Sequence, residues 1–142
     1  MTYQKVSRLV FTLLGISTLV ATLPAQRSQT AVETRIDVLK EKLDRGEKVL
    51  IVDVRREDEV RSGSIPGAVN IPMAELEARM KDIAKDVQIV FACDHGDRSS
   101  RAAELFEKNG YKTSTFCALE GWKSKGYKTG PTRKPDPGPI QP

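Results

Sequence analysis

The sequence predicts an α/β domain in which a mainly parallel central sheet lies between layers of helices. Short apolar runs at 49–54, 87–92 and 113–119 alternate with stretches of helical length. This alternation is typical of β-α-β units, whose strands pair in parallel. The first two runs are apolar at nearly every position, as strands covered on both faces are. Together these observations favour helices on both sides of one sheet.

The first half of the chain is expected to form a helix, a strand, a turn and a second strand. The helix is expected over 31–45, because apolar side chains recur there at helical spacing and Gly46 ends the pattern. The run at 49–54 is the first core strand. One helical turn is expected at 57–61, and a brief strand at 69–71 after Pro-Gly turn chemistry.

The second half continues the alternation. A helix is expected over 73–83, with its apolar residues on one side, and the strand 87–92 follows it. The next helix is expected over 99–109 and the last strand over 113–119. A short helical piece is expected around 122–125.

Length and charge narrow the class of protein. The 142 residues suffice for one domain with its own core. The 23 basic and 19 acidic residues give a net charge of +4, spread along the chain rather than in blocks. No basic stripe with interleaved aromatic residues is present, so a nucleic-acid partner is not expected. We find neither metal-ligand spacing nor a dinucleotide fingerprint, and expect no cofactor. The sequence sets no oligomeric state.

The N-terminus has the pattern of an export signal. Lys5 and Arg8 precede an uncharged apolar run at 9–23. The run is shorter than a full membrane span of about 20 residues, which favours a cleaved signal peptide over 1–25. Retention of this segment as a membrane anchor is the alternative. Either outcome predicts an exported protein, periplasmic in a bacterial cell, with 26–29 as a linker.

The folded domain is therefore expected over 30–128. The final stretch, 129–142, is rich in proline and also contains glycine. This composition predicts a disordered tail.

The most informative stretch lies between the strand 87–92 and the helix 99–109. It reads Cys93-Asp94-His95-Gly96-Asp97-Arg98-Ser99. A thiol between a strand and a helix meets the N–H groups of the turn and the positive end of the helix dipole. Both favour the thiolate, which is the nucleophilic form. Arg98 adds a fixed positive charge and donors suited to an oxyanion. Cys93 is therefore the candidate nucleophile at an anion site.

Other side chains near this loop have less certain roles. His95, the only histidine, is either a helper that contacts substrate or a surface residue that fills the turn. Cys117, in the last expected strand, is expected to pack as a small apolar residue, with a resolving role as the alternative. Asp53 and Arg55 are expected to form an ion pair at the end of the first core strand, which either positions the loop or merely ends the strand.

The chain resembles a rhodanese-homology domain over roughly residues 30–128. Four landmarks carry the resemblance, in the family's order. They are Ile51-Val52-Asp53-Val54-Arg55 with Glu57 and Glu59 after it, Gly63-Ser64-Ile65-Pro66-Gly67-Ala68-Val69-Asn70-Ile71-Pro72, the Cys93 loop with Ser99-Ser100-Arg101-Ala102, and Ala118-Leu119-Glu120-Gly121-Trp122. With the export signal, the chain most resembles small periplasmic thiosulfate sulfurtransferases. It departs from the family at Ser64, where histidine is common, and in a shortened last helix after Trp122.

The resemblance implies a rhodanese-like three-layer fold and a thiosulfate sulfurtransferase. Cys93 takes the outer sulfur of thiosulfate as a persulfide, and a thiol or cyanide then accepts it. The substrate-binding loop residues Asp94, His95, Gly96, Asp97 and Ser99 would stabilise the persulfide with their N–H groups, while Arg98 would hold the sulfonate end of the donor. Asp94 and Asp97 add negative charge, which has little effect if they point outward.

Three other functions remain open at this point. A phosphatase of the related dual-specificity type has a loop one residue longer than the Asp94–Asp97 spacer between Cys93 and Arg98. A persulfide-carrying or partner-docking module would show little turnover. A structural domain would have Cys93 bridged to Cys117.

Overall fold

The computed structural model describes residues 32–111 and 114–142. The expected signal or anchor at 1–25 and the linker at 26–29 lie outside these residues. In the part of the chain that is described, no helix is long and apolar enough to cross a membrane.

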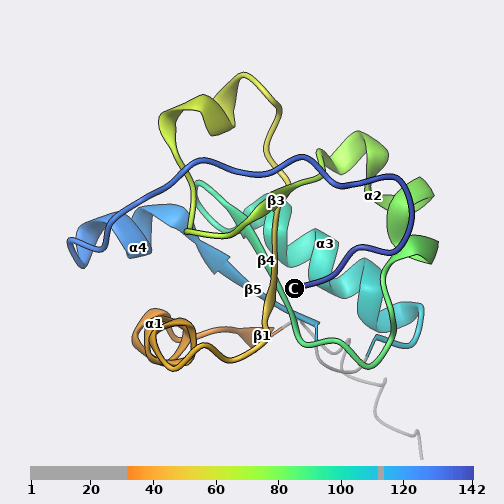
Figure 1. Ribbon diagram of the computed structural model, residues 1–142, viewed down its shortest axis with the longest axis horizontal. Helices are drawn as coiled ribbons and strands as arrows, with labels where there is room; N and C mark the ends of the chain where they lie inside the picture. Colours follow the sequence, from red (N-terminus) through yellow and green to blue (C-terminus); the bar gives the residue numbers. More distant parts are fainter. Residues whose placement is uncertain (1–31, 112–113) are drawn as a thin grey trace, which may run out of the picture.

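One sheet of five parallel strands forms the centre of the domain, with helices on both sides of it (Figure 1). The strand order is β1-β5-β4-β2-β3. The best-buried strands, β2 and β4, lie side by side near the middle of the sheet. Because they run parallel, the C-terminal ends of both lie at the same edge of the sheet. The strands are β1 (Val32–Glu33), β2 (Leu50–Asp53), β3 (Val69–Asn70), β4 (Ile89–Cys93) and β5 (Ser114–Ala118).

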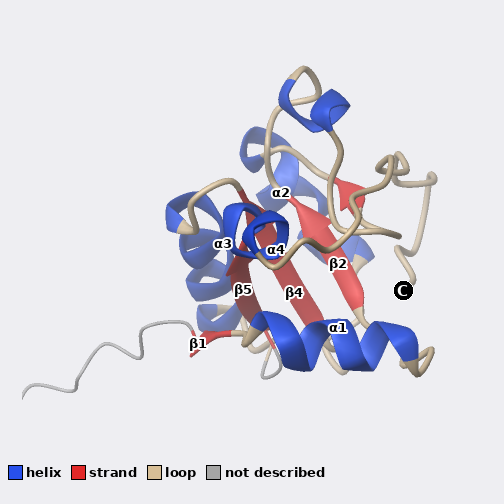
Figure 2. Cartoon of the chain, turned by 90° about the vertical axis from the view of Figure 1, so that its left-hand side faces the viewer, coloured by secondary structure: helices blue, strands red, loops and turns tan. Residues whose placement is uncertain are grey.

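Helices cover both faces of the sheet. Helices α1 and α4 lie on the face turned toward the viewer in Figure 2, and α2 and α3 pack on the other face. The expected three-layer α/β fold is therefore confirmed. The helices are α1 (Ile36–Asp44), α2 (Met73–Arg79), α3 (Asp97–Lys108) and α4 (Leu119–Ser124), with 3-10 turns η1 (Glu59–Ser62) and η2 (Met80–Asp82).

Two of the expected helices differ from those in the structure. The helix expected over 31–45 begins only at Ile36, because the preceding residues form β1 and pair with β5. The Thr34 N–H donates to the Phe116 carbonyl at 2.7 Å, a contact between distant parts of the chain that helical periodicity does not reveal. The helix expected over 73–83 ends as the 3-10 turn η2. The short final helix, α4, is present but begins at Leu119, earlier than the expected 122–125.

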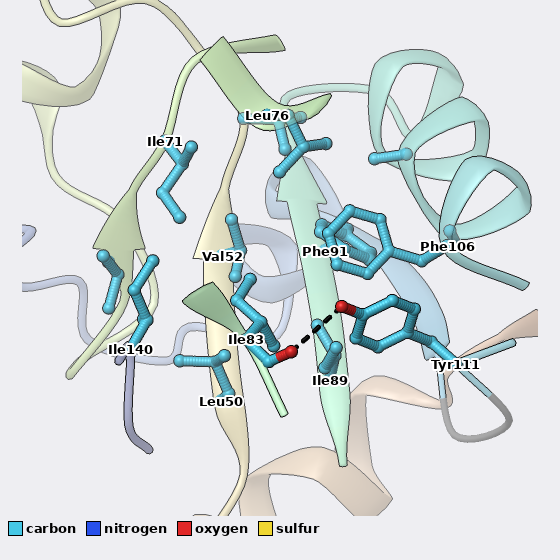
Figure 3. Packing of buried hydrophobic residues seen from close by; sticks show 14 of the residues in the cluster. Leu50, Val52, Ile71, Leu76, Ile83, Ile89, Phe91, Phe106, Tyr111 and Ile140 are labelled. Atoms are coloured by element: carbon cyan, nitrogen blue, oxygen red, sulfur yellow. Dashed lines mark hydrogen bonds between the residues drawn. The ribbon is translucent and has the colours of Figure 1, made fainter. Parts of the chain in front are cut away.

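Alternate residues of β4 point to opposite faces of the sheet, as the pleat of a strand requires. Phe91 and Cys93 belong to the core beneath α2 and α3, whereas Val90 and Ala92 belong to the core beneath α1. Phe91 meets the Phe106 ring of α3 edge-on at 4.8 Å (Figure 3). Both clusters consist of buried apolar side chains, so β4 is fixed in position and its last residue, Cys93, is fixed with it.

The prediction of a disordered tail at 129–142 is wrong. Gly130 pairs with Ser64, Arg133 pairs with Val69, and Ile140 forms a bridge to Ile83. The segment runs along the outer edge of the sheet beside β3 (Figure 1). Proline, which lacks an N–H donor, is tolerated at such an edge. The tail thus covers an edge strand that would otherwise expose unpaired backbone groups.

Ile140 anchors this segment in the core. Its side chain is 2% exposed and lies among Leu50, Ile71 and Ile83 in Figure 3. Its backbone N–H donates to the Asp82 carbonyl at 2.8 Å. Two residues from the C-terminus, it completes the apolar cluster beneath α2 and α3.

We expect Ile140→Ala to lower the free energy of unfolding by about 2–5 kcal/mol, because it leaves a cavity in a packed core. Equilibrium unfolding in urea measures this change. Val32→Ala serves as a control, since Val32 is 62% exposed and its truncation should change stability little. Equal small effects from both substitutions would show that the segment does not contribute to the core.

Candidate active site

Cys93 is the last residue of β4 and directly precedes the loop that leads to α3. Its Sγ atom accepts hydrogen bonds from the N–H groups of Gly96, at 3.1 Å, and Ser99, at 3.3 Å. The Ser99 hydroxyl also lies 3.3 Å from the sulfur. Backbone donors aimed at sulfur stabilise negative charge there, and the N-terminal end of α3 adds to this effect.

Gly96 makes this arrangement possible. Its φ of +99° lies in the left-handed region, which residues with a side chain rarely adopt. The chain therefore turns sharply enough to direct the Gly96 N–H back toward Cys93. Ser99, in the first turn of α3, holds the other side of the loop: its hydroxyl lies 3.1 and 3.2 Å from the carbonyl oxygens of Gly96 and Cys117, which share its single proton.

Asp53 and Arg55 form the expected ion pair, but it is buried rather than at the surface. Their side chains are 0% and 1% exposed, and the Arg55 Nη2 lies 2.7 Å from the Asp53 Oδ2. The Ser64 hydroxyl donates to the same carboxylate at 2.5 Å, so Ser64 supplies a hydrogen bond where the family commonly has histidine. An exposed ion pair contributes little to the free energy of unfolding. This pair is different, because loss of either partner would leave the charge of the other buried and uncompensated.

Asp94 points toward two guanidinium groups rather than outward, so the condition under which its charge would have little effect is not met. Its carboxylate lies 3.0 Å from the Arg55 Nη1 and 3.3 Å from the Arg98 Nη2. Asp94 thus joins the Cys93 loop to the end of β2 and to the first turn of α3. Its charge is placed beside the sulfur site and is balanced by two guanidinium groups.

Arg98 pairs with Glu59, a residue of η1. Its Nη1 and Nη2 atoms meet the two carboxylate oxygens at 2.8 and 2.9 Å. This bidentate contact lowers the pKa of Glu59 to about 2, helped by the N–H that Arg56 donates, and it raises the pKa of Arg98. Arg98 therefore places the expected positive charge beside the loop, but both of its terminal nitrogens already bind the Glu59 carboxylate.

His95 and Asp97 lie at the surface of the loop. The His95 Nδ1 is 2.9 Å from a carboxylate oxygen of Glu120, at the start of α4, and both side chains are more than 70% exposed. Asp97 is exposed in the first turn of α3. The hydrogen bonds to the Cys93 sulfur come from Gly96 and Ser99. Neither the His95 nor the Asp97 side chain is therefore placed to act as a base for this thiol. Among the described residues, no group of three or more His, Cys, Asp or Glu is placed to hold a metal ion.

Cys117 lies on the opposite face of the sheet from Cys93. It pairs in register with Ala92 rather than Cys93, and its side chain belongs to the core beneath α1 and α4. Burial raises the pKa of its thiol to about 12. Both cysteines are free. With both thiols free and on opposite faces of the sheet, the structure gives no support to the bridged structural domain or to a resolving role for Cys117, and its expected packing role is the one the structure shows.

Three site residues had no role assigned from the sequence. Glu59 holds Arg98, Glu120 holds His95, and Asn70 donates its amide to the Asp53 and Arg55 carbonyls. Glu59 lies 39 residues from Arg98, so no local spacing links the two. Only its place in the landmark after Arg55 could have drawn attention to it.

A cysteine whose sulfur accepts hydrogen bonds from loop N–H groups, at the carboxyl end of a parallel sheet, has the geometry of enzymes that use a Cys nucleophile. A model of the rhodanese-like domain matches residues 36–125. The chain belongs to this family.

Relatives and solved structures of the family agree. The putative sulfurtransferase YtwF of Bacillus subtilis is 39% identical over 75 residues, which cover 53% of this chain and 73% of that protein. The human thiosulfate:glutathione sulfurtransferase is 35% identical over 75 residues, covering 43% and 65%. The crystal structure of a rhodanese-related protein from Thermoplasma volcanium superposes with a TM-score of 0.63 at 27% identity, covering 70% of this chain and 97% of that one. These similarities support sulfur transfer as the general chemistry.

The Glu59–Arg98 pair predicts a pH dependence of stability. Because its folded-state pKa is lowered from 4.5 to about 2, the ionised Glu59 stabilises the fold above pH 4.5. That contribution should be lost as the pH falls from 4.5 toward 2. The wild type should therefore lose more unfolding free energy in this window than Glu59→Gln does. Parallel pH curves, measured by urea unfolding, would contradict the assignment.

Proposed function

We propose that the protein is a sulfurtransferase that moves sulfane sulfur from thiosulfate or a similar donor to a thiol or cyanide. The Cys93 thiolate attacks the outer sulfur of the donor, and the S–S bond of thiosulfate breaks. Sulfite leaves with the bonding electron pair, and Cys93 keeps the sulfur as a persulfide. The acceptor then attacks the terminal sulfur and regenerates the thiolate.

One observation carries this proposal: two backbone N–H groups converge on the Sγ atom of Cys93. They stabilise the thiolate before attack, and they leave a loop able to hold a terminal persulfide sulfur afterwards. The loop spans only Asp94–Asp97 between Cys93 and Arg98, which suits a sulfur atom better than a phosphoryl group. The relative that transfers sulfur from thiosulfate supports the donor class.

Cys93→Ser should abolish persulfide formation after treatment with thiosulfate, whereas Cys117→Ala should retain it. Intact-protein and peptide mass spectrometry measure the added sulfur of about 32 Da that covalent transfer leaves on the nucleophile. Steady-state release of sulfite with cyanide as acceptor then distinguishes turnover from a carrier that is loaded once. An adduct on Cys117 in the wild type would contradict the assignment.

We also propose that the protein is exported. Lys5 and Arg8 ahead of the uncharged run at 9–23 support this, and the shortness of the run favours cleavage over anchoring. In a bacterial host the protein should be recovered from the periplasm with an N-terminus near Gln26. N-terminal sequencing of fractionated cells tests this; a chain that starts at Met1 in the membrane fraction would indicate an anchor, and one in the soluble cytoplasm would overturn export.

A further inference from the structure

A continuous set of ionic contacts surrounds the Cys93 loop, and carboxylates outnumber guanidinium groups within it. The contacts run from Asp53 to Arg55, from Arg55 to Asp94, from Asp94 to Arg98 and from Arg98 to Glu59. Arg56 extends the set, because it lies 3.7 Å from Glu59 and 3.1 Å from Asp58. Three guanidinium groups therefore face four carboxylates. The backbone donors of the loop favour one negative charge at sulfur, but the side chains around it supply no excess of positive charge for a second.

Arg98 is the guanidinium that a donor can reach. It is 31% exposed, whereas Arg55 is 1% exposed and enclosed by its partners. Glu59 occupies both of its terminal nitrogens, in the geometry that a sulfonate would also use. A dianionic donor must therefore displace this carboxylate or bind beside it. Because Glu59 and Asp94 are 22% and 32% exposed, the solvent screens such repulsion only in part.

We propose that Glu59 determines donor specificity: by occupying Arg98, it disfavours dianionic thiosulfate relative to sulfane donors that carry a single negative charge. This inference rests on the proposed sulfur transfer by Cys93 and names the class of donor that the site accepts best. Glu59 does not touch the reacting sulfur, so its role is exerted through Arg98.

Two donors of nearly the same size separate the effect of charge. Thiosulfate is a dianion, and methanethiosulfonate replaces one of its oxygens by a methyl group and is a monoanion. Each transfers one sulfur to Cys93; the S–S bond breaks and sulfite or methanesulfinate leaves with the electron pair. The quantity to measure is kcat/KM for thiosulfate divided by kcat/KM for methanethiosulfonate, with cyanide as the common acceptor.

Glu59→Gln should raise this ratio about tenfold, the order expected when one charge-assisted contact is released. The change should come from a lower KM for thiosulfate. Glu57→Gln is the matched control, because Glu57 lies two residues away, is 63% exposed and pairs with Lys134 rather than Arg98. Its ratio should equal that of the wild type. An unchanged or lowered ratio in Glu59→Gln would overturn the proposal.

The Arg98→Ala background tests whether Glu59 acts through Arg98. There the Glu59→Gln substitution should no longer raise the ratio, since no guanidinium remains to be released. A full gain in that background would overturn competition for Arg98. Thermal unfolding of each variant verifies that it is folded.

A wild-type measurement covers the case in which Glu59→Gln fails to fold. Alkylation of Cys93 by neutral iodoacetamide is followed by mass spectrometry of the Cys93 peptide, with sulfate, a dianion, or methanesulfonate, a monoanion of similar shape, added as competitor. Methanesulfonate should slow the alkylation at the same concentration as sulfate or a lower one; protection by sulfate at a lower concentration would overturn the inference. Failure of the proposed function is distinct, because Cys93 would then acquire no sulfur from either donor.

Discussion

The buried ion pair of Asp53 and Arg55 is the interaction on which the site depends. Arg55 extends from the end of β2 to Asp94 in the Cys93 loop and to the Gly63 carbonyl beyond η1. Three separate segments are thereby fixed to one guanidinium. Because both partners are shielded from water, removing either would leave an unpaired charge, at a cost of about 3–5 kcal/mol. The loop is therefore held in place by electrostatics as well as by the packing of β4.

The C-terminal segment supports this arrangement from outside the family domain, whose match ends at residue 125. Gly130 exchanges two backbone hydrogen bonds with Ser64, at 2.8 and 2.9 Å. Ser64 in turn donates its hydroxyl to Asp53. A stretch rich in proline thus closes the sheet edge and also orders the residue that completes the buried carboxylate's hydrogen bonds. The same contacts of Gly130 and Ser64 thus cover the edge of the sheet and hold the buried Asp53 carboxylate in place.

The loop and the side chains around it act on charge in opposite directions. The N–H groups of Gly96 and Ser99 favour a single negative charge on sulfur, whereas the carboxylates of Asp94 and Glu59 oppose further negative charge beside it. A thiolate or a persulfide satisfies the first condition without violating the second. This balance of charges is the basis of the donor preference that we propose.

Local patterns in the sequence determined the alternation of strands and helices, the loop after β4 and Cys93 as the candidate nucleophile, because periodicity and turn chemistry act over a few residues. The landmarks around these elements gave the family. Tertiary structure alone decided the partners of Asp94 and Arg98, the face on which Cys117 lies and the ordered path of 129–142. Those features depend on contacts between residues distant in the chain, such as Glu59 with Arg98 and Ile140 with Ile83. Such contacts arise only when the packed sheet brings the segments together.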